Sequence, residues 1–339
     1  MKGNRVITAS LAIIVIFIIG VVLKLAKPVL FPFSLAVFLS FVLSPVLNLL
    51  NRLKVPKVMS IVLILLLTFF LIFLFGNLFY SSGKQLASEF PGYAEKIISI
   101  LDNFQNRLEL SRFNWQRIDW EQQLNLNRVG SLILSSIGPF FSFFSNLFLV
   151  LFFLVFILAG RGRIKQKVSS SLEDRRSKKV IQIIDNIDGQ IQKYLAIKTL
   201  VSLITGVLAT AVFLSFGLDF AIVFGILTFL LNYIPNIGSF IATIFPVGIA
   251  FFQFESGWNA LFILIILVFL QMSLGNLLEP RLMGAGLGLS PLVILFSLFF
   301  WGWLWGIPGM LLAVPLLAII KIICSNIPSL EFVAVMMSK

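Results

Sequence analysis

The stretch FLLNYIPNIGSFIATIFP, from Phe229 to Pro246, and the stretch WGWLWGIPGMLLAVP, from Trp301 to Pro315, decide the fold of this 339-residue chain. Each lies inside an apolar segment broken by glycine and proline, the first from Asp219 to Phe254 and the second from Pro291 to Cys324. A straight helix of about 35 residues would reach roughly 50 Å, whereas the hydrocarbon core of a bilayer is about 30 Å thick. We therefore expect each segment to fold back at its tip as a hairpin of two short helices. Paired interrupted segments of this kind are typical of transporter binding sites.

The composition is that of a membrane protein. Hydrophobic residues make up 59% of the chain and charged residues 12%. The apolar residues occur in runs of about twenty, the length that a membrane-crossing helix needs. This pattern predicts an all-α polytopic protein with about eight membrane segments, including two inverted re-entrant helical hairpins and a small extracytoplasmic helical insert.

The reactive side chains exclude most catalytic chemistry. The chain has no histidine and a single cysteine, Cys324, which excludes Cys/His metal sites, intrachain disulfides and histidine-dependent catalysis. The phosphate-binding loop G-x-x-x-x-G-K-[ST] does not occur, which excludes an ATP-driven pump of that type. We therefore expect no enzyme activity, no cofactor and no metal, and an ion or solute gradient must supply any energy.

The apolar runs predict six full spans besides the two hairpins, at residues 6–23, 29–50, 59–80, 139–159, 200–218 and 258–274. The first run resembles a signal peptide, but it is longer than such a peptide needs and is interpreted as a span. The predicted division of the chain is 1–80 for spans one to three, 81–137 for the extracytoplasmic insert, 138–160 for span four, 161–198 for a cytoplasmic basic linker and amphipathic helix, 199–325 for a C-terminal transport unit with both hairpins, and 326–339 for a cytoplasmic tail.

The basic residues predict the orientation of the chain in the membrane. With the N-terminus in the cytoplasm, 18 of the 26 Lys and Arg residues fall on the inside, ten of them between Arg161 and Lys198. Cytoplasmic loops of membrane proteins carry such an excess. We expect a multi-pass protein of the cell inner membrane with both termini in the cytoplasm. The net charge of +12 is explained by these loops, so it does not predict nucleic-acid binding.

Two amphipathic stripes lie outside the predicted spans. The insert carries one in Leu86, Phe90, Tyr93, Ile97, Leu101, Phe104 and Leu108, and Trp115, Ile118 and Trp120 begin a further helix there. We interpret the insert as a cap packed on itself or on a neighbouring subunit, with capture of substrate as the alternative. The second stripe comprises Val180, Ile184, Ile187, Ile191 and Leu195. It predicts a helix along the membrane surface before span five.

The hairpin tips are the predicted binding site. Proline and glycine leave backbone hydrogen-bonding groups without partners, and hydrocarbon cannot satisfy these groups. Such groups therefore face protein, water or a ligand, and asparagine and glutamine side chains nearby add donors and acceptors. The candidate substrate-binding residues are Asn232, Pro235, Asn236, Gly238, Gln271, Asn276, Gly306, Pro308 and Gly309. The alternative is a structural kink that neighbouring helices satisfy.

Three ionisable residues are candidates for coupling or gating. Glu279 and Arg281 end an apolar helix two residues apart, and Asp219 begins the first hairpin segment. Charged groups at membrane depth are costly unless they are paired or hydrated, so they are functional candidates. Glu279 is the best candidate for a titratable acid and Asp219 is the second. The alternative is a contact of Arg281 with Glu279 or with the backbone that only caps the helix.

Several motifs resemble the autoinducer-2 exporter family of bacterial permeases. They are NLLEPRLMG from Asn276 to Gly284, LSPLV from Leu289 to Val293, the stretch from Trp301 to Pro315, NYIPNIG from Asn232 to Gly238, and the residues from Tyr194 to Lys198. The order of segments over the N-terminal half is similar too. The resemblance implies export of a small polar signal, or exchange of a monovalent cation for protons in some members. It also implies a homo-oligomer, with a pentamer expected.

The residues leave three classes of function open. The first is a secondary carrier in which the hairpin-bearing C-terminal unit moves and a small polar solute or monovalent cation is transported with saturable flux. The second is a passive channel, for which amides and glycines in the membrane would serve equally well. The third is a membrane scaffold that binds partners and tolerates changes of Glu279 or Arg281.

Overall fold

The protein is all-α, as predicted. The computed structural model describes residues 2–109, 147–160, 163–171, 174–254, 256–284 and 287–338, and this part of the chain contains helices and no β-strand. The helices are α1 (Lys2–Leu25), α2 (Lys27–Val42), α3 (Ser44–Arg52), α4 (Lys57–Glu109), a helix over Leu147–Gly160, α7 (Arg163–Ser171), α8 (Asp174–Phe216), α9 (Ala221–Leu231), α10 (Ile237–Gln253), α11 (Gly257–Gln271), α12 (Glu279–Met283), α13 (Pro291–Trp305), α14 (Ile307–Ser325) and α15 (Glu331–Met336).

The long apolar helices are consistent with a polytopic membrane protein. Within the described residues, four helices are long and apolar enough to cross a membrane, or up to six if two bent pairs of helices are each one span. The four are Lys57–Glu89, Arg176–Phe216, Gly257–Met283 and Ile307–Asn326. One bent pair joins the end of α1 to α2 at an angle of 81°. The first two predicted spans therefore correspond to α1 and to α2 with α3.

Two helices continue where the sequence predicted a boundary. Helix α4 runs for 53 residues through the predicted end of span three, so the first stripe of the insert extends the span itself. Helix α8 runs for 43 residues, so the predicted surface helix and span five are one continuous helix. The prediction of a separate helix that lies along the membrane surface before span five is therefore wrong. The part of the insert that holds Trp115, Ile118 and Trp120 is outside the described residues.

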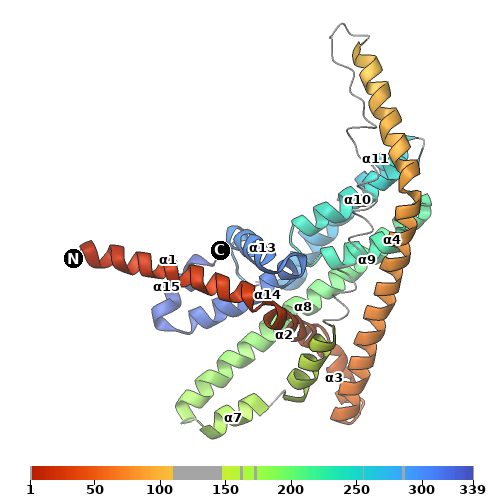
Figure 1. Ribbon diagram of the computed structural model, residues 1–339. Coiled ribbons are helices and arrows are strands. Elements are labelled where there is room, and N and C mark those ends of the chain that lie inside the picture. Colours follow the sequence, from red (N-terminus) through yellow and green to blue (C-terminus); the bar gives the residue numbers. More distant parts are fainter. Residues whose placement is uncertain are drawn as a thin grey trace. The chain divides into compact units, whose positions relative to one another are not determined.

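Both broken segments are helical hairpins (Figure 1). Helices α9 and α10 pack against each other across one break, and α13 and α14 pack across the other. The break of each segment into two helices is confirmed. The four arms have 11, 17, 15 and 19 residues. Helix α14 is long enough to cross a membrane, so the expectation that every arm is shorter than a full span is wrong for this arm.

The chain forms two compact units, each with its own core. Unit 1 comprises Met1–Leu66, Asn146–Leu200 and Glu279–Lys339, and unit 2 comprises Leu67–Ser145 and Val201–Leu278. The predicted C-terminal transport unit, 199–325, is thus divided between them, with one hairpin in each unit.

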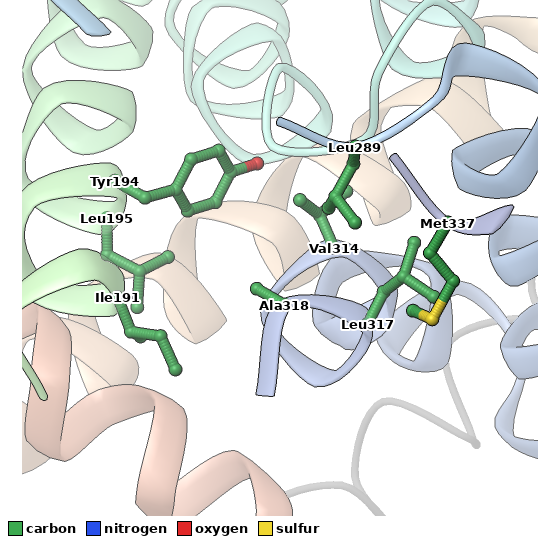
Figure 2. Packing of buried hydrophobic residues seen from close by; sticks show 8 residues of the cluster. All are labelled: Ile191, Tyr194, Leu195, Leu289, Val314, Leu317, Ala318 and Met337. Atoms are coloured by element: carbon green, nitrogen blue, oxygen red, sulfur yellow. The ribbon is translucent and has the colours of Figure 1, made fainter. Parts of the chain in front are cut away.

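The core of unit 1 joins α8 to the C-terminal hairpin. Figure 2 shows Ile191, Tyr194 and Leu195 from α8 facing side chains of α14, together with Leu289 and Met337. Two of the five residues of the second predicted stripe, Ile191 and Leu195, are therefore buried in protein. The final residues also pack here, because the Ser290 amide donates to the Met337 carbonyl at 2.9 Å. In unit 2, Phe213 of α8 and Ile263 of α11 are fully buried in the corresponding cluster.

Candidate transport site

The tip of the first hairpin is built around two close contacts. Helix α9 ends at Leu231, and the side-chain amide of Asn232 donates to the Ser202 hydroxyl of α8 at 3.1 Å. Both of these polar residues are buried. Asn236 has φ of 60° and ψ of −53°, the centre of a γ-turn in which the Ile237 amide donates to the Pro235 carbonyl at 2.6 Å, and it turns the chain into α10. Gly238 then packs on the last turn of α9, where an added Cβ would lie 1.8 Å from the Leu231 carbonyl oxygen.

The tip of the second hairpin also has a glycine packed closely against the backbone of the facing arm. Gly306 has φ of 78° and forms the break between α13 and α14. Gly309 packs against the end of α13, where an added Cβ would lie 2.1 Å from the Trp301 carbonyl oxygen. Pro308 precedes this glycine in the first turn of α14, where its missing N–H costs nothing. In both hairpins a glycine just after the break therefore allows the two arms to approach closely.

The remaining amides lie on or near the helix that follows the first hairpin. Gln271 is the last residue of α11, and Asn276 lies in a π-helix over Met272–Leu278. Among the described residues, Asn236, Gln271 and Asn276 have no side-chain hydrogen-bond partner. These amides remain candidates for a binding site, and π-helical turns occur frequently at functional sites.

Glu279 forms a buried ion pair that the sequence analysis did not predict. The Lys198 ammonium of α8 donates to both carboxylate oxygens of Glu279, each at 2.8 Å. The two side chains are 5% and 15% exposed. Glu279 begins α12 directly after the π-helix, and both residues belong to unit 1. Arg281, the partner considered from the sequence, is exposed, and none of the described residues bonds to its side chain.

The pair joins the ends of two apolar stretches. Lys198 stands at the beginning of the apolar run that ends α8, and Glu279 stands at the end of the apolar helix over Gly257–Leu278. The ion pair therefore brings these two ends of the chain into contact.

Comparison with known proteins identifies the family of the chain. The family model described as AI-2E family transporter matches residues 11–329, which include both hairpins and the ion pair. The chain belongs to the AI-2E transporter family.

Relatives of this AI-2E protein are similar over almost their whole length. A candidate transport protein of Borreliella burgdorferi is 33% identical over 98% of this chain and 90% of its own. The AI-2 transport protein TqsA of Escherichia coli K12 is 31% identical over 100% of this chain and 96% of its own. YhhT of the same strain, a candidate transport protein, is 28% identical over 95% of this chain. The protein is accordingly a multi-pass membrane transporter.

Asp219 has a structural partner in this AI-2E transporter. Its carboxylate accepts a hydrogen bond of 2.9 Å from the Tyr93 hydroxyl of α4, and its backbone amide donates to Gln253. The Lys96 ammonium donates to the Phe252 and Gln253 carbonyls at the end of α10. These contacts, all within unit 2, form a latch that joins the extended part of α4 to the two ends of the first hairpin segment. Burial raises the pKa of the Tyr93 hydroxyl, and the hydrogen bond to Asp219 raises it further.

Tyr93→Phe should lower the stability of the protein by about 1.5 kcal/mol, because it removes a hydrogen bond to a charged group. The mid-point of thermal unfolding in detergent measures this, with Asp102→Asn, an exposed acid on the same helix, as the control. The raised pKa favours the neutral hydroxyl in the folded state. The deficit should be full below about pH 10, the ordinary pKa of tyrosine, and should shrink at higher pH. A deficit that is equal at all pH values would contradict the assignment.

Sequence reasoning found both hairpin tips and Glu279 but missed the partners. Lys198 was assigned to the solvated linker, although it directly precedes an apolar run in the same way that Glu279 directly follows one. That shared position at the end of a span was the available signal. Ser202, Tyr93 and Gln253 had no signal of their own, because their partners are distant in the sequence.

Proposed function

We propose that this AI-2E transporter is a secondary carrier that exports a small polar solute of the AI-2 type. The observation that carries the proposal is the bidentate Lys198–Glu279 pair at the junction of an irregular helix. Ionisable groups inside membrane proteins mark substrate or proton pathways. The similarity to TqsA, an AI-2 transport protein, supports the solute class.

The pair supplies a coupling element with two states. When Glu279 is charged, Lys198 holds it and fixes the end of the π-helix against α8. A proton on the carboxylate removes one charge of the pair and weakens this attachment. Release of the attachment would let the hairpin-bearing C-terminal residues move, which alternates access to the site from the two sides. A proton gradient could thereby drive export without ATP.

The same acid supports an alternative, exchange of a monovalent cation for protons. Glu279 is the acid that would hold the cation, but both of its oxygens are engaged by Lys198. This engagement of the carboxylate favours the polar solute as the substrate.

Counterflow in proteoliposomes tests the proposal. Purified protein is reconstituted with unlabelled AI-2 or ribose inside, and uptake of the labelled solute is followed with and without a pH gradient. We expect saturable counterflow of at least one polyol and acceleration by a proton gradient. Flux that does not saturate would indicate a channel. Sodium flux without any polyol flux would establish the antiporter instead.

We also propose that the transporter works as a homo-oligomer, with a pentamer as the expected form. The family resemblance suggests this assembly, and the large apolar side chains exposed on α4 and α11 offer surfaces for lipid or for neighbouring subunits. Native mass spectrometry of the protein in detergent measures the number of subunits. A protein that remains monomeric in mild detergent and in lipid nanodiscs would contradict the proposal.

The proposed orientation places both termini and α7 in the cytoplasm. A cysteine at Ser170 of α7 should react with a membrane-impermeant maleimide in inside-out vesicles and stay unmodified in intact cells, because the linker carries most of the inside basic residues. Cys324→Ser, which removes the buried native cysteine, provides the background. Labelling of the Ser170→Cys variant in intact cells would reverse the orientation.

A further inference from the structure

A pocket with several polar lining residues lies within unit 1. It has a volume of about 390 Å³. Ligand pockets typically measure about 300–1,000 Å³, so a molecule of monosaccharide size fits. Its lining residues come from α3, the first residue of α4, the helix over Leu147–Gly160, α7 and α8, and they are Ser44, Leu47, Asn48, Asn51, Lys57, Leu158, Lys165, Asp188 and Gln192.

Three side-chain amides give the pocket its hydrogen-bonding capacity. Asn48 and Asn51 lie one turn apart on α3, and Gln192 lies on α8. In the described part of the chain none of these amides has a side-chain hydrogen-bond partner. Each amide has both donors and an acceptor, a combination that suits hydroxyl groups, since a hydroxyl also donates and accepts.

The charged side chains of the described lining are two lysines and one acid, Asp188. Lys165 forms an ion pair with Asp185, and the Lys57 ammonium donates to the Ala159 carbonyl at 3.0 Å. Each lysine of the lining therefore already has a partner and is not left to bind an anionic headgroup or phosphate. A neutral polar ligand fits this described lining best.

We propose that this pocket recognises a neutral polyhydroxylated solute on the cytoplasmic side, before the solute is exported. The inference rests on the proposed function, because the expected topology puts α3, the start of α4 and α7 at the inner face. Apolar contact is provided by Leu47 and Leu158, and the amides of Asn48, Asn51 and Gln192 bind hydroxyl groups. The pocket is thus the loading site of the export route.

Protection from alkylation tests binding without any transport. In a Cys324→Ser background, Lys57→Cys is treated with an impermeant maleimide in inside-out vesicles, with and without AI-2 or ribose. Lys57 is an exposed lining residue and supplies none of the three amides, so this variant keeps the proposed binding groups. We expect either polyol to slow modification, and addition of Gln192→Ala to remove the protection. Asn186→Cys is the matched control, because Asn186 is exposed on α8 outside the pocket. Modification of the Lys57→Cys variant at the same rate with and without both polyols would overturn the site, as would protection that depends only on phosphatidylglycerol in the vesicles.

Transport kinetics test the proposed pocket and the proposed function separately. Gln192→Ala should raise KM for a polyol entering from the cytoplasmic face by about three- to tenfold and leave the maximal rate unchanged, since one uncharged hydrogen bond is lost. Asn186→Ala should leave both values unchanged. Wild-type transport with an unaltered KM in Gln192→Ala would refute the site alone. Absence of polyol flux in wild-type protein, with protection retained, would refute the proposed function and keep the binding site.

Discussion

Gly238→Ala is expected to abolish most of the folded protein, and Gly309→Ala to do the same. An alanine Cβ at these positions would lie 1.8 Å from the Leu231 carbonyl oxygen and 2.1 Å from the Trp301 carbonyl oxygen. Each carbonyl belongs to the backbone of the facing arm, so the two arms of the hairpin must separate. Overpacking costs about 1–3 kcal/mol, and more when the backbone must move. A loss of about 3 kcal/mol reduces the ratio of folded to unfolded protein more than a hundredfold.

Fluorescence-detected size exclusion and thermal unfolding in detergent measure the effect. Gly248→Ala is the matched control, because Gly248 lies in the same helix α10 and a Cβ there would meet nothing within 4 Å. That substitution should stabilise the protein slightly, since glycine weakens a helix by about 0.5–1 kcal/mol relative to alanine. If Gly238→Ala and Gly248→Ala unfold at the same temperature, the close packing at the first tip is wrong.

Removal of either member of the Lys198–Glu279 pair should be strongly destabilising. Lys198→Met leaves a carboxylate that is 15% exposed without its partner, and Glu279→Leu leaves an ammonium that is 5% exposed. Breaking a buried ion pair in this way costs about 3–5 kcal/mol, because a buried charge remains uncompensated. We expect low yields of folded protein from both single variants. The double variant with Lys198→Met and Glu279→Leu should recover folding, because apolar replacements of a buried pair are often neutral or stabilising.

Transport by the double variant then decides the role of the pair. Flux is normalised to folded protein, so that lost stability does not count as lost function. If the pair is the coupling element, the double variant folds and its proton-driven flux is reduced at least tenfold. Wild-type flux from the folded double variant would refute the coupling role and would mean that the pair only stabilises the fold. Lys179→Gln is the control, since Lys179 is an exposed basic residue of the same helix α8 and should affect neither measurement strongly.

The features that depend on local physics could be read from the sequence. Long apolar runs are expected to be helical in a membrane, and the clusters of Pro and Gly around Asn236 and Gly306 favour a break there, because proline lacks a backbone donor and glycine can adopt the positive φ that Gly306 has. The hairpins were therefore predictable from their own residues. The ends of α4 and α8 were not, since each polar stretch in these helices is compatible both with a loop and with a helix that leaves the membrane.

The partners of the polar groups could be identified only from the packing of the helices. Glu279 was a candidate from its sequence position, but its partner Lys198 lies 81 residues away, and Tyr93 lies 126 residues from Asp219. The spacing of apolar residues along a helix indicates which face of that helix is buried, but it does not identify the helix that packs against this face. The pairing of these groups follows from the close approach of whole helices, and that approach is the sum of many packing contacts across the fold. A charge at the end of a span therefore indicates a side chain that needs a partner. Which residue becomes the partner depends on how the helices pack.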